Sequence, residues 1–218
     1  IPIAGLRIAS SPDLGCWWVH PEIQSAVGSA TDLLSELGAD VAAAPPLFRP
    51  EDARLWLDLW GIFMAGYYGE TAERRGDELD PDVVSLIAHG LRFSAADAKR
   101  MEVARTKVWR RVSAVLADVD AIVCPTMSTP PGPASKSDAR PNASLDDGLH
   151  HEEDMTSVWN LVSPFPIATV PCGRHGGENL GLPIGLQIVA RPGREDVVLS
   201  IAEAIESRIG APRWRPDE

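Results

Sequence analysis

The residues of this chain do not form any of the common short motifs that support chemistry unaided. The sequence lacks a G-x-S-x-G nucleophile elbow, a phosphate-binding Walker loop, a G-x-G-x-x-G turn after a strand and an H-E-x-x-H helix. A conventional α/β-hydrolase, a P-loop enzyme and a zinc protease of that type are therefore disfavoured.

Two polar clusters contain chemically capable residue types. His150 and His151 precede three acidic residues, but adjacent histidines point in different directions, so we expect a solvated surface rather than a metal site. Ser135, Lys136 and Ser137 have the residue types of a Ser/Lys hydrolase. Neighbours in an extended loop alternate in direction, and this Pro/Ser-rich segment would not bury a lysine base. We therefore expect a solvated loop there and predict no catalytic residue and no metal ligand.

Two short segments are candidates for substrate binding. Pro125, Thr126 and Met127 follow an apolar strand, and Trp159 and Asn160 lie at a second chain reversal. Sites in α/β folds lie at strand ends and in the loops that follow them. We predict that these five residues contact the substrate.

A stripe of aromatic residues runs through the helix expected over 51–68. Trp56, Trp60, Phe63 and Tyr67 recur at intervals of three and four positions. Such a stripe is typical of a core-facing helix, but pocket walls are also apolar and aromatic, so both interpretations stay open.

The elements that position these segments are readable from apolar periodicity and capping residues. A strand over 6–10, a helix from Pro21 to the cap at Gly38 and a strand at Val41 form a β-α-β pattern, which favours an α/β fold. Ser94 and Asp97 have the spacing of a capping box at a helix start. Further helices and strands are expected over these ranges: 81–90, 95–115, 120–124, 154–160, 166–171, 183–189 and 195–209. A Pro-rich loop fills 126–147 and a Gly-rich connection fills 173–181. We treat 1–218 as a single domain.

Composition limits the function classes. The 218 residues carry a formal net charge of −11, which disfavours binding to a phosphate backbone, and no apolar run is long enough to span a membrane. The three cysteines, Cys16, Cys124 and Cys172, form no C-x-x-C pair, so we expect reduced, buried thiols in a cytoplasmic protein. No signal peptide is recognisable at Ile1.

Three segments, in this order and spacing, resemble one enzyme family. DAIVCPT over 120–126, WNLVSPFPIATVPCG over 159–173 and GLPIGLQIVAR over 181–191 are similar to the conserved segments in the second half of amidase-signature enzymes. The last is the most specific, and the likeness extends over nearly the whole chain.

The resemblance implies a mixed β-sheet flanked by helices, the carboxyl-terminal half of the amidase-signature fold. It implies hydrolysis of a carboxylic amide C–N bond in a small molecule, without metal or cofactor. In that family a serine nucleophile, a second serine and a lysine do the chemistry, and all precede the region matched here. The resemblance therefore implies that the catalytic half is absent from this chain.

The expected partner is a complementary amino-terminal half that carries those residues, in an enzyme that could form homo-oligomers. This chain would supply scaffold and one pocket wall and would be inactive alone. We also expect Leu6, Ile8 and the strand over 183–189 to be continuous with sheet supplied from outside.

Two other functions stay open. The chain could be part of the amidase component of a tRNA-dependent amidotransferase, although its acidic charge counts weakly against a tRNA partner. It could also be a binding or assembly module that kept the fold and lost the chemistry.

Overall fold

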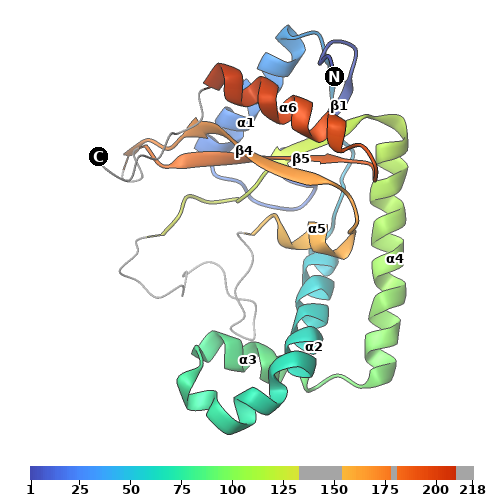
Figure 1. Cartoon of the computed structure of the whole chain (residues 1–218), viewed down its shortest axis with the longest axis vertical. Helices are drawn as coiled ribbons and strands as arrows, with labels where there is room; N and C mark the ends of the chain where they lie inside the picture. Colours follow the sequence, from blue (N-terminus) through green and yellow to red (C-terminus); the bar gives the residue numbers. More distant parts are fainter. Residues whose placement is uncertain (133–153, 178–180, 210–218) are drawn as a thin grey trace.

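A computed structural model describes residues 1–132, 154–177 and 181–209 of the chain (Figure 1). Its centre is a five-stranded sheet in the order β2-β1-β3-β5-β4. The strands are β1 (Arg7–Ser10), β2 (Asp40–Ala43), β3 (Ala121–Pro125), β4 (Ile167–Arg174) and β5 (Pro183–Ala190). β1 is parallel to β2 and to β3, whereas β5 is antiparallel to β3 and to β4. The fold is thus α/β with a mixed sheet, as the resemblance implied.

Helices cover both faces of the sheet. α1 (Pro21–Glu36) and α6 (Glu195–Ile209) pack together over one face (Figure 1). α2 (Pro50–Arg75), α4 (Ala95–Asp118) and the short α5 (Ser157–Leu161) lie on the other side. At the far end of α2, the 3₁₀ turn η1 (Gly76–Glu78) leads into α3 (Pro81–Gly90). No helix within the described ranges combines the length and apolarity needed to cross a bilayer.

The β1-α1-β2 unit forms as its sequence predicts. The His20 side chain accepts a hydrogen bond from the backbone N–H of Glu22, and Pro21 occupies the first helical turn, where its missing N–H costs nothing. The buried stripe of α1 is Ile23, Val27, Ala30 and Leu34. Gly38 has a φ of +91°, the left-handed conformation that ends the helix.

α4 also begins as predicted. Ser94 and Asp97 form the reciprocal capping box, with the Ser94 hydroxyl accepting from the Asp97 N–H and the Asp97 carboxylate accepting from the Ser94 N–H. Val108, Val112 and Leu116 form its buried stripe.

β3 is buried along its whole length, and β5 pairs with it in the core. One polar side chain, Gln187 of β5, is buried there at 2% exposure. Its amide donates to the carbonyl oxygens of Pro125 at 2.9 Å and Met155 at 3.3 Å. The bonds satisfy a buried amide and tie the end of β3 to the segment that precedes α5.

The sheet corrects one expectation. We expected Leu6, Ile8 and the strand over 183–189 to border sheet supplied from outside. Leu6 comes just before β1 and Ile8 lies within it, but neither β1 nor β5 is an edge strand. Each pairs on both sides within the described chain, and the outer strands are β2 and β4. The reason is topological: the α1 crossover places β2 outside β1, and the β4–β5 hairpin places β4 outside β5.

The cysteines partly match their expected placement. Cys124 and Cys172 are buried, and burial raises the pKa of the Cys172 thiol to about 12. Cys16 is exposed instead. The pKa of its thiol is raised to about 11. The larger cause is partial burial of the sulfur, and the next is the nearby negative charge of Asp52.

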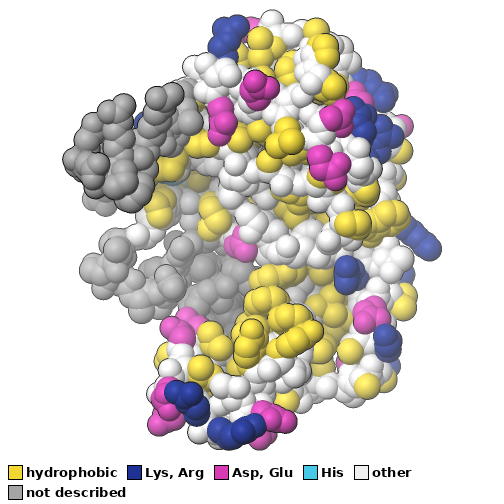
Figure 2. Space-filling model, viewed as in Figure 1, with side chains coloured by type: hydrophobic (Ala, Val, Ile, Leu, Met, Phe, Trp, Pro, Cys, Tyr) yellow, Lys and Arg dark blue, Asp and Glu magenta, His cyan; other side chains and the backbone are white. Residues whose placement is uncertain are grey.

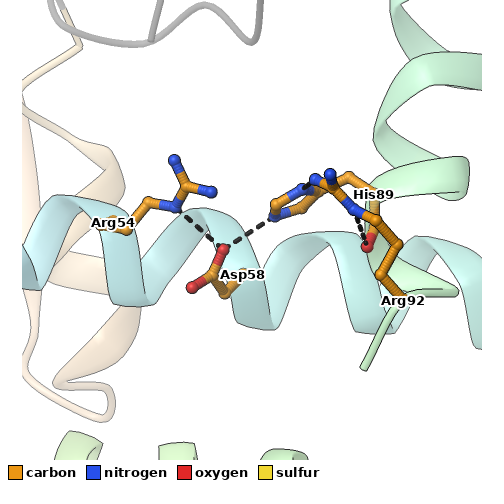
Figure 3. A network of polar contacts seen from close by, with 4 residues as sticks. All are labelled: Arg54, Asp58, His89 and Arg92. Carbon is orange, nitrogen blue, oxygen red and sulfur yellow. Dashed lines mark hydrogen bonds and ion pairs between the residues drawn. The ribbon is translucent and has the colours of Figure 1, made fainter. Parts of the chain in front are cut away.

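α2 and α3 form a helical arm that is fixed by close contact. A Cβ atom on Gly90 would lie 1.9 Å from the carbonyl oxygen of Gly61, so only glycine fits this crossing. The buried ring of His89 bridges the same helices: its Nε2 lies 2.7 Å from Oδ1 of Asp58, and Arg92 contacts its Nδ1 (Figure 3). Because an arginine cannot accept a hydrogen bond, Nδ1 is the acceptor and Nε2–H donates to Asp58.

The aromatic stripe on α2 is only partly in the core. The rings of Trp60 and Phe63 stack at a centroid distance of 5.2 Å, yet these side chains are 39% and 44% exposed. Trp56 packs against the core at the other end of the stripe, and Tyr67 is largely exposed. Hydrophobic side chains gather on this part of the surface in the space-filling view (Figure 2). An apolar cavity of about 380 Å³ lies between α2 and the start of α3.

Candidate functional site

A cavity of about 410 Å³ lies where β3 ends and β5 begins, beside the first turn of α1. Ligand sites in proteins are commonly of this size and are lined mainly by apolar groups with a few polar ones. The lining residues are Ile23, Thr126, Met127, Thr129, Pro131, Thr169, Pro171, His175, Pro183, Ile184 and Gly185.

Backbone hydrogen bonds fix the segment after β3 against its neighbours. The N–H of Thr126 donates to the carbonyl of Gly185 at 3.0 Å, and the N–H of His20 donates to the carbonyl of Ser128 at 2.8 Å. Met127 forms an isolated antiparallel bridge with Asp154. The cavity wall is therefore joined to β5, to the start of α1 and to the segment before α5.

Two hydroxyl groups of the wall lack partners. The Oγ1 atoms of Thr126 and Thr129 are buried and make no hydrogen bond with any part of the chain that the structure describes. Buried hydroxyls are nearly always bonded, so a pair of unsatisfied ones beside a cavity is unusual.

A buried histidine forms the third polar feature. Nδ1 of His175 lies 3.1 Å from Oε2 of Glu22, and the other carboxylate oxygen accepts from the N–H of Gly176 at 3.3 Å. The hydrogen bond from His175 is the main cause that lowers the pKa of the Glu22 carboxyl. With a carboxylate accepting at Nδ1, that nitrogen carries the proton and Nε2 is the acceptor when the ring is neutral.

The structure brings two of the five predicted substrate residues to the cavity, Thr126 and Met127. Pro125 is buried in β3, and Asn160 is exposed at α5. The side chain of Trp159 is 2% exposed and packs edge-on against Phe48, with ring centroids 5.0 Å apart. These three do not line the cavity.

The described lining of the cavity is mostly apolar, with a few polar groups. Within the ranges that the structure describes, His175 is the only titratable residue that lines the cavity, and it is paired with Glu22. Neither threonine hydroxyl has a base bonded to it among those residues. No group of three or more potential metal ligands occurs in the described ranges. The segments 135–137 and 150–153, considered above for chemistry, lie outside the described residues.

His175, Thr129 and Gly185 were missed by sequence reasoning. His175 follows β4, within the Gly-rich segment that we interpreted as a plain connection, and its partner Glu22 is distant in sequence. Gly185 did carry a signal, because a glycine inside an apolar strand often marks a close approach by a neighbour.

Comparisons with known proteins agree with the fold. A family model described as Amidase matches residues 3–199. An acylamidase from Rhodococcus erythropolis is 28% identical over 212 residues, which cover 94% of this chain and 43% of the relative. A glutamyl-tRNA(Gln) amidotransferase subunit from Roseiflexus sp. (strain RS-1) is 30% identical over 227 residues, covering 94% of this chain and 45% of the relative.

The solved structure of a bacterial aryl acylamidase of the amidase signature family superposes with a TM-score of 0.79 at 21% identity. The match covers 94% of this chain and 44% of that structure. The chain thus spans less than half the length of the relatives it matches.

Proposed function

We propose, because this chain belongs to the amidase family, that it is one part of an enzyme that hydrolyses a carboxylic amide C–N bond. The observation that carries the proposal is the family match over 3–199, which spans most of the chain. The cavity beside Thr126 and Met127 supports it, since it offers a largely apolar space to the group attached to the amide.

The proposed enzyme divides its work between two parts. A serine of the amino-terminal part attacks the amide carbonyl carbon, the C–N bond breaks, and the amine leaves with a proton passed on by a second serine and a lysine. Water then attacks the acyl-serine ester and releases the acid. This chain supplies the sheet beneath that machinery and one wall of the pocket. The relatives' greater length supports the division, as does the lack of an activated nucleophile on the described cavity wall.

A second candidate function is the amidase component of a tRNA-dependent amidotransferase. The 30% identity with the Roseiflexus protein favours it. The net charge of −11 disfavours direct contact between this chain and tRNA, so we rank this candidate below a small-molecule amidase.

Reconstitution tests the proposal. The chain is combined with a separately produced amino-terminal amidase half, and hydrolysis of a simple anilide is measured for the mixture and for each part. We expect turnover from the mixture alone, with a serine-directed reagent labelling only the amino-terminal half. Turnover by the 218-residue chain alone, abolished by a reagent that labels it, would contradict the division of labour.

A further inference from the structure

One ring nitrogen of His175 is unbonded and accessible. Nδ1 faces Oε2 of Glu22 at 3.1 Å, whereas Nε2, on the other side of the ring, makes no hydrogen bond within the described chain. Nε2 is not one of the buried polar atoms that lack a partner, in contrast to the hydroxyl oxygens of Thr126 and Thr129, so it keeps accessible surface. Because His175 lines the cavity and is otherwise buried, Nε2 faces the cavity.

Glu22 determines which nitrogen of the ring carries the proton. Its carboxylate accepts from Nδ1–H of His175, so in the neutral ring Nε2 has the free lone pair and acts only as an acceptor. The other carboxylate oxygen accepts from the N–H of Gly176 at 3.3 Å. The hydrogen bond from His175 is the main cause that lowers the pKa of the Glu22 carboxyl. The carboxylate is therefore charged and held against the ring.

The backbone holds His175 in place as well. Its N–H donates to the carbonyl of Leu182 at 2.8 Å, and its carbonyl accepts from the N–H of Gly181 at 2.9 Å. These bonds join the end of β4 to the start of β5. A ring that is fixed through its backbone and through Nδ1 loses little conformational freedom when a ligand binds Nε2, so the acceptor is preorganised.

The cavity surrounds this acceptor with apolar side chains. Those that line it and keep exposed surface are Met127, Pro131, Pro171 and Pro183. An aliphatic or aryl group would bury apolar surface against them, and an O–H or N–H on that group would pair with Nε2. A ligand group that only accepts hydrogen bonds, such as an ether oxygen, would leave both itself and Nε2 unpaired.

We propose that Nε2 of His175 binds a hydrogen-bond donor, the O–H or N–H of an otherwise apolar ligand, and that Glu22 is the positioning residue that keeps the ring proton on Nδ1. If the ligand is the substrate, which rests on the proposed function, the donor lies on the group attached to the amide. The acceptor role rests on the geometry of His175 and Glu22 alone.

NMR titration of the full 218-residue chain tests the inference without requiring turnover. The probes are 4-ethylphenol and 1-ethyl-4-fluorobenzene, which are alike in shape and differ by an O–H donor for a C–F group. In mildly alkaline buffer, where histidine rings are ordinarily neutral, the ring ¹⁵N signals of His175 should show a proton on Nδ1 and none on Nε2. Adding 4-ethylphenol should shift the Nε2 signal.

Substitutions measure what the acceptor contributes. The parent chain should prefer 4-ethylphenol, and His175→Phe, which keeps a flat ring without the acceptor, should lower that preference by about fivefold or more. His175→Gln should keep more of the preference, because its side-chain amide supplies an acceptor at about the reach of Nε2. Glu22→Ala leaves Nδ1 without its acceptor and allows the proton to move to Nε2, so the preference should also fall.

The matched control is His89→Phe. His89 is likewise buried beside a carboxylate, with Nε2 2.7 Å from Oδ1 of Asp58, but it lies on α3 and does not line the cavity. This substitution should leave the preference unchanged.

Three results would overturn the inference. They are equal changes in the affinity of the two probes on His175→Phe, a proton on Nε2 of the neutral ring, and no shift of the His175 signals with 4-ethylphenol. If His175→Phe fails to fold, the ring signals of the parent chain and the preference of Glu22→Ala decide the matter without it.

The outcomes also separate the inference from the proposed function. If the reconstituted protein hydrolyses amides but the preference does not depend on His175, the inference is wrong and the proposed function stands. If the preference depends on His175 but the reconstituted protein hydrolyses no amide, the binding site stands and the proposed function is wrong.

Discussion

The hydroxyl oxygen of Thr126 lies in the space that a side chain on Gly185 would occupy, 2.6 Å from the position of the missing Cβ atom. The two residues are also joined by the hydrogen bond from the Thr126 N–H to the Gly185 carbonyl. Backbone and side chain thus fix the end of β3 against β5 at the edge of the cavity, and a side chain on Gly185 would overlap that of Thr126.

Gly185→Ala should therefore destabilise the protein by about 1–3 kcal/mol, the usual cost of overpacking a site that cannot expand. Denaturant unfolding measures this. Gly28→Ala is the matched control, since Gly28 lies within α1 and a Cβ there would meet nothing within 4 Å. It should stabilise the helix by up to about 1 kcal/mol. Equal unfolding free energies for the two variants would contradict the close contact.

Trp159→Ala should act on stability rather than on substrate choice. The buried ring packs on Phe48, so truncation should cost about 3–5 kcal/mol. In the reconstituted enzyme, the ratio of kcat/KM for bulky and small amides should stay the same. Trp18→Ala, which removes a side chain that is 68% exposed, should change stability by less than about 0.5 kcal/mol. A tenfold change in that ratio for Trp159→Ala would instead restore the pocket role predicted from sequence.

Gly90→Ala should separate α3 from α2. The added methyl group would overlap the carbonyl of Gly61, and backbone cannot move aside as a flexible side chain can, so we expect a loss of about 3 kcal/mol or more. Hydrogen exchange should show lost protection in α3 while β3 and β5 stay protected. Gly66→Ala, at an open position of α2, should be neutral or stabilising. Unchanged exchange in α3 of the Gly90→Ala variant would rule out the close crossing.

Asp97→Asn should lower thermal stability in a pH-dependent way. Hydrogen bonds from the Ser94 hydroxyl and N–H and from Arg100 lower the pKa of Asp97 to about 2, from an ordinary value of 3.8. A lowered native pKa means that the carboxylate stabilises the fold above pH 3.8 and stops doing so as the pH falls to about 2. The difference in Tm between the parent and the variant should thus be constant from pH 7 to about 5 and shrink between about pH 4 and 2. A difference that persists undiminished at pH 2 would argue against the capping role.

Features set by neighbouring residues were predictable from sequence. The Pro21 and Gly38 ends of α1 and the Ser94–Asp97 box of α4 each depend on bonds within one turn. The mixed sheet, by contrast, came from the family resemblance.

The site was less predictable because its contacts are distant in the chain. The pairing of His175 with Glu22 joins residues 153 positions apart. A tryptophan at a chain reversal can face a pocket or pack in the core, and the sequence alone does not show that Trp159 packs on Phe48. The arrangement of β2 and β4 as the outer strands likewise depends on pairing between distant segments.

The bridge between Met127 and Asp154 has an evolutionary consequence. It holds together the two ends of the connection from β3 to α5, so an insertion or deletion between them leaves the register of the sheet intact. Loop-closure entropy grows slowly with length, by about 0.6 kcal/mol for each doubling, so such changes are thermodynamically mild. Because Met127 also lines the cavity, variation in this connection arises next to the proposed binding site. A change in the length of this connection beyond Pro131 would therefore act beside the cavity while the bridge keeps its two ends together.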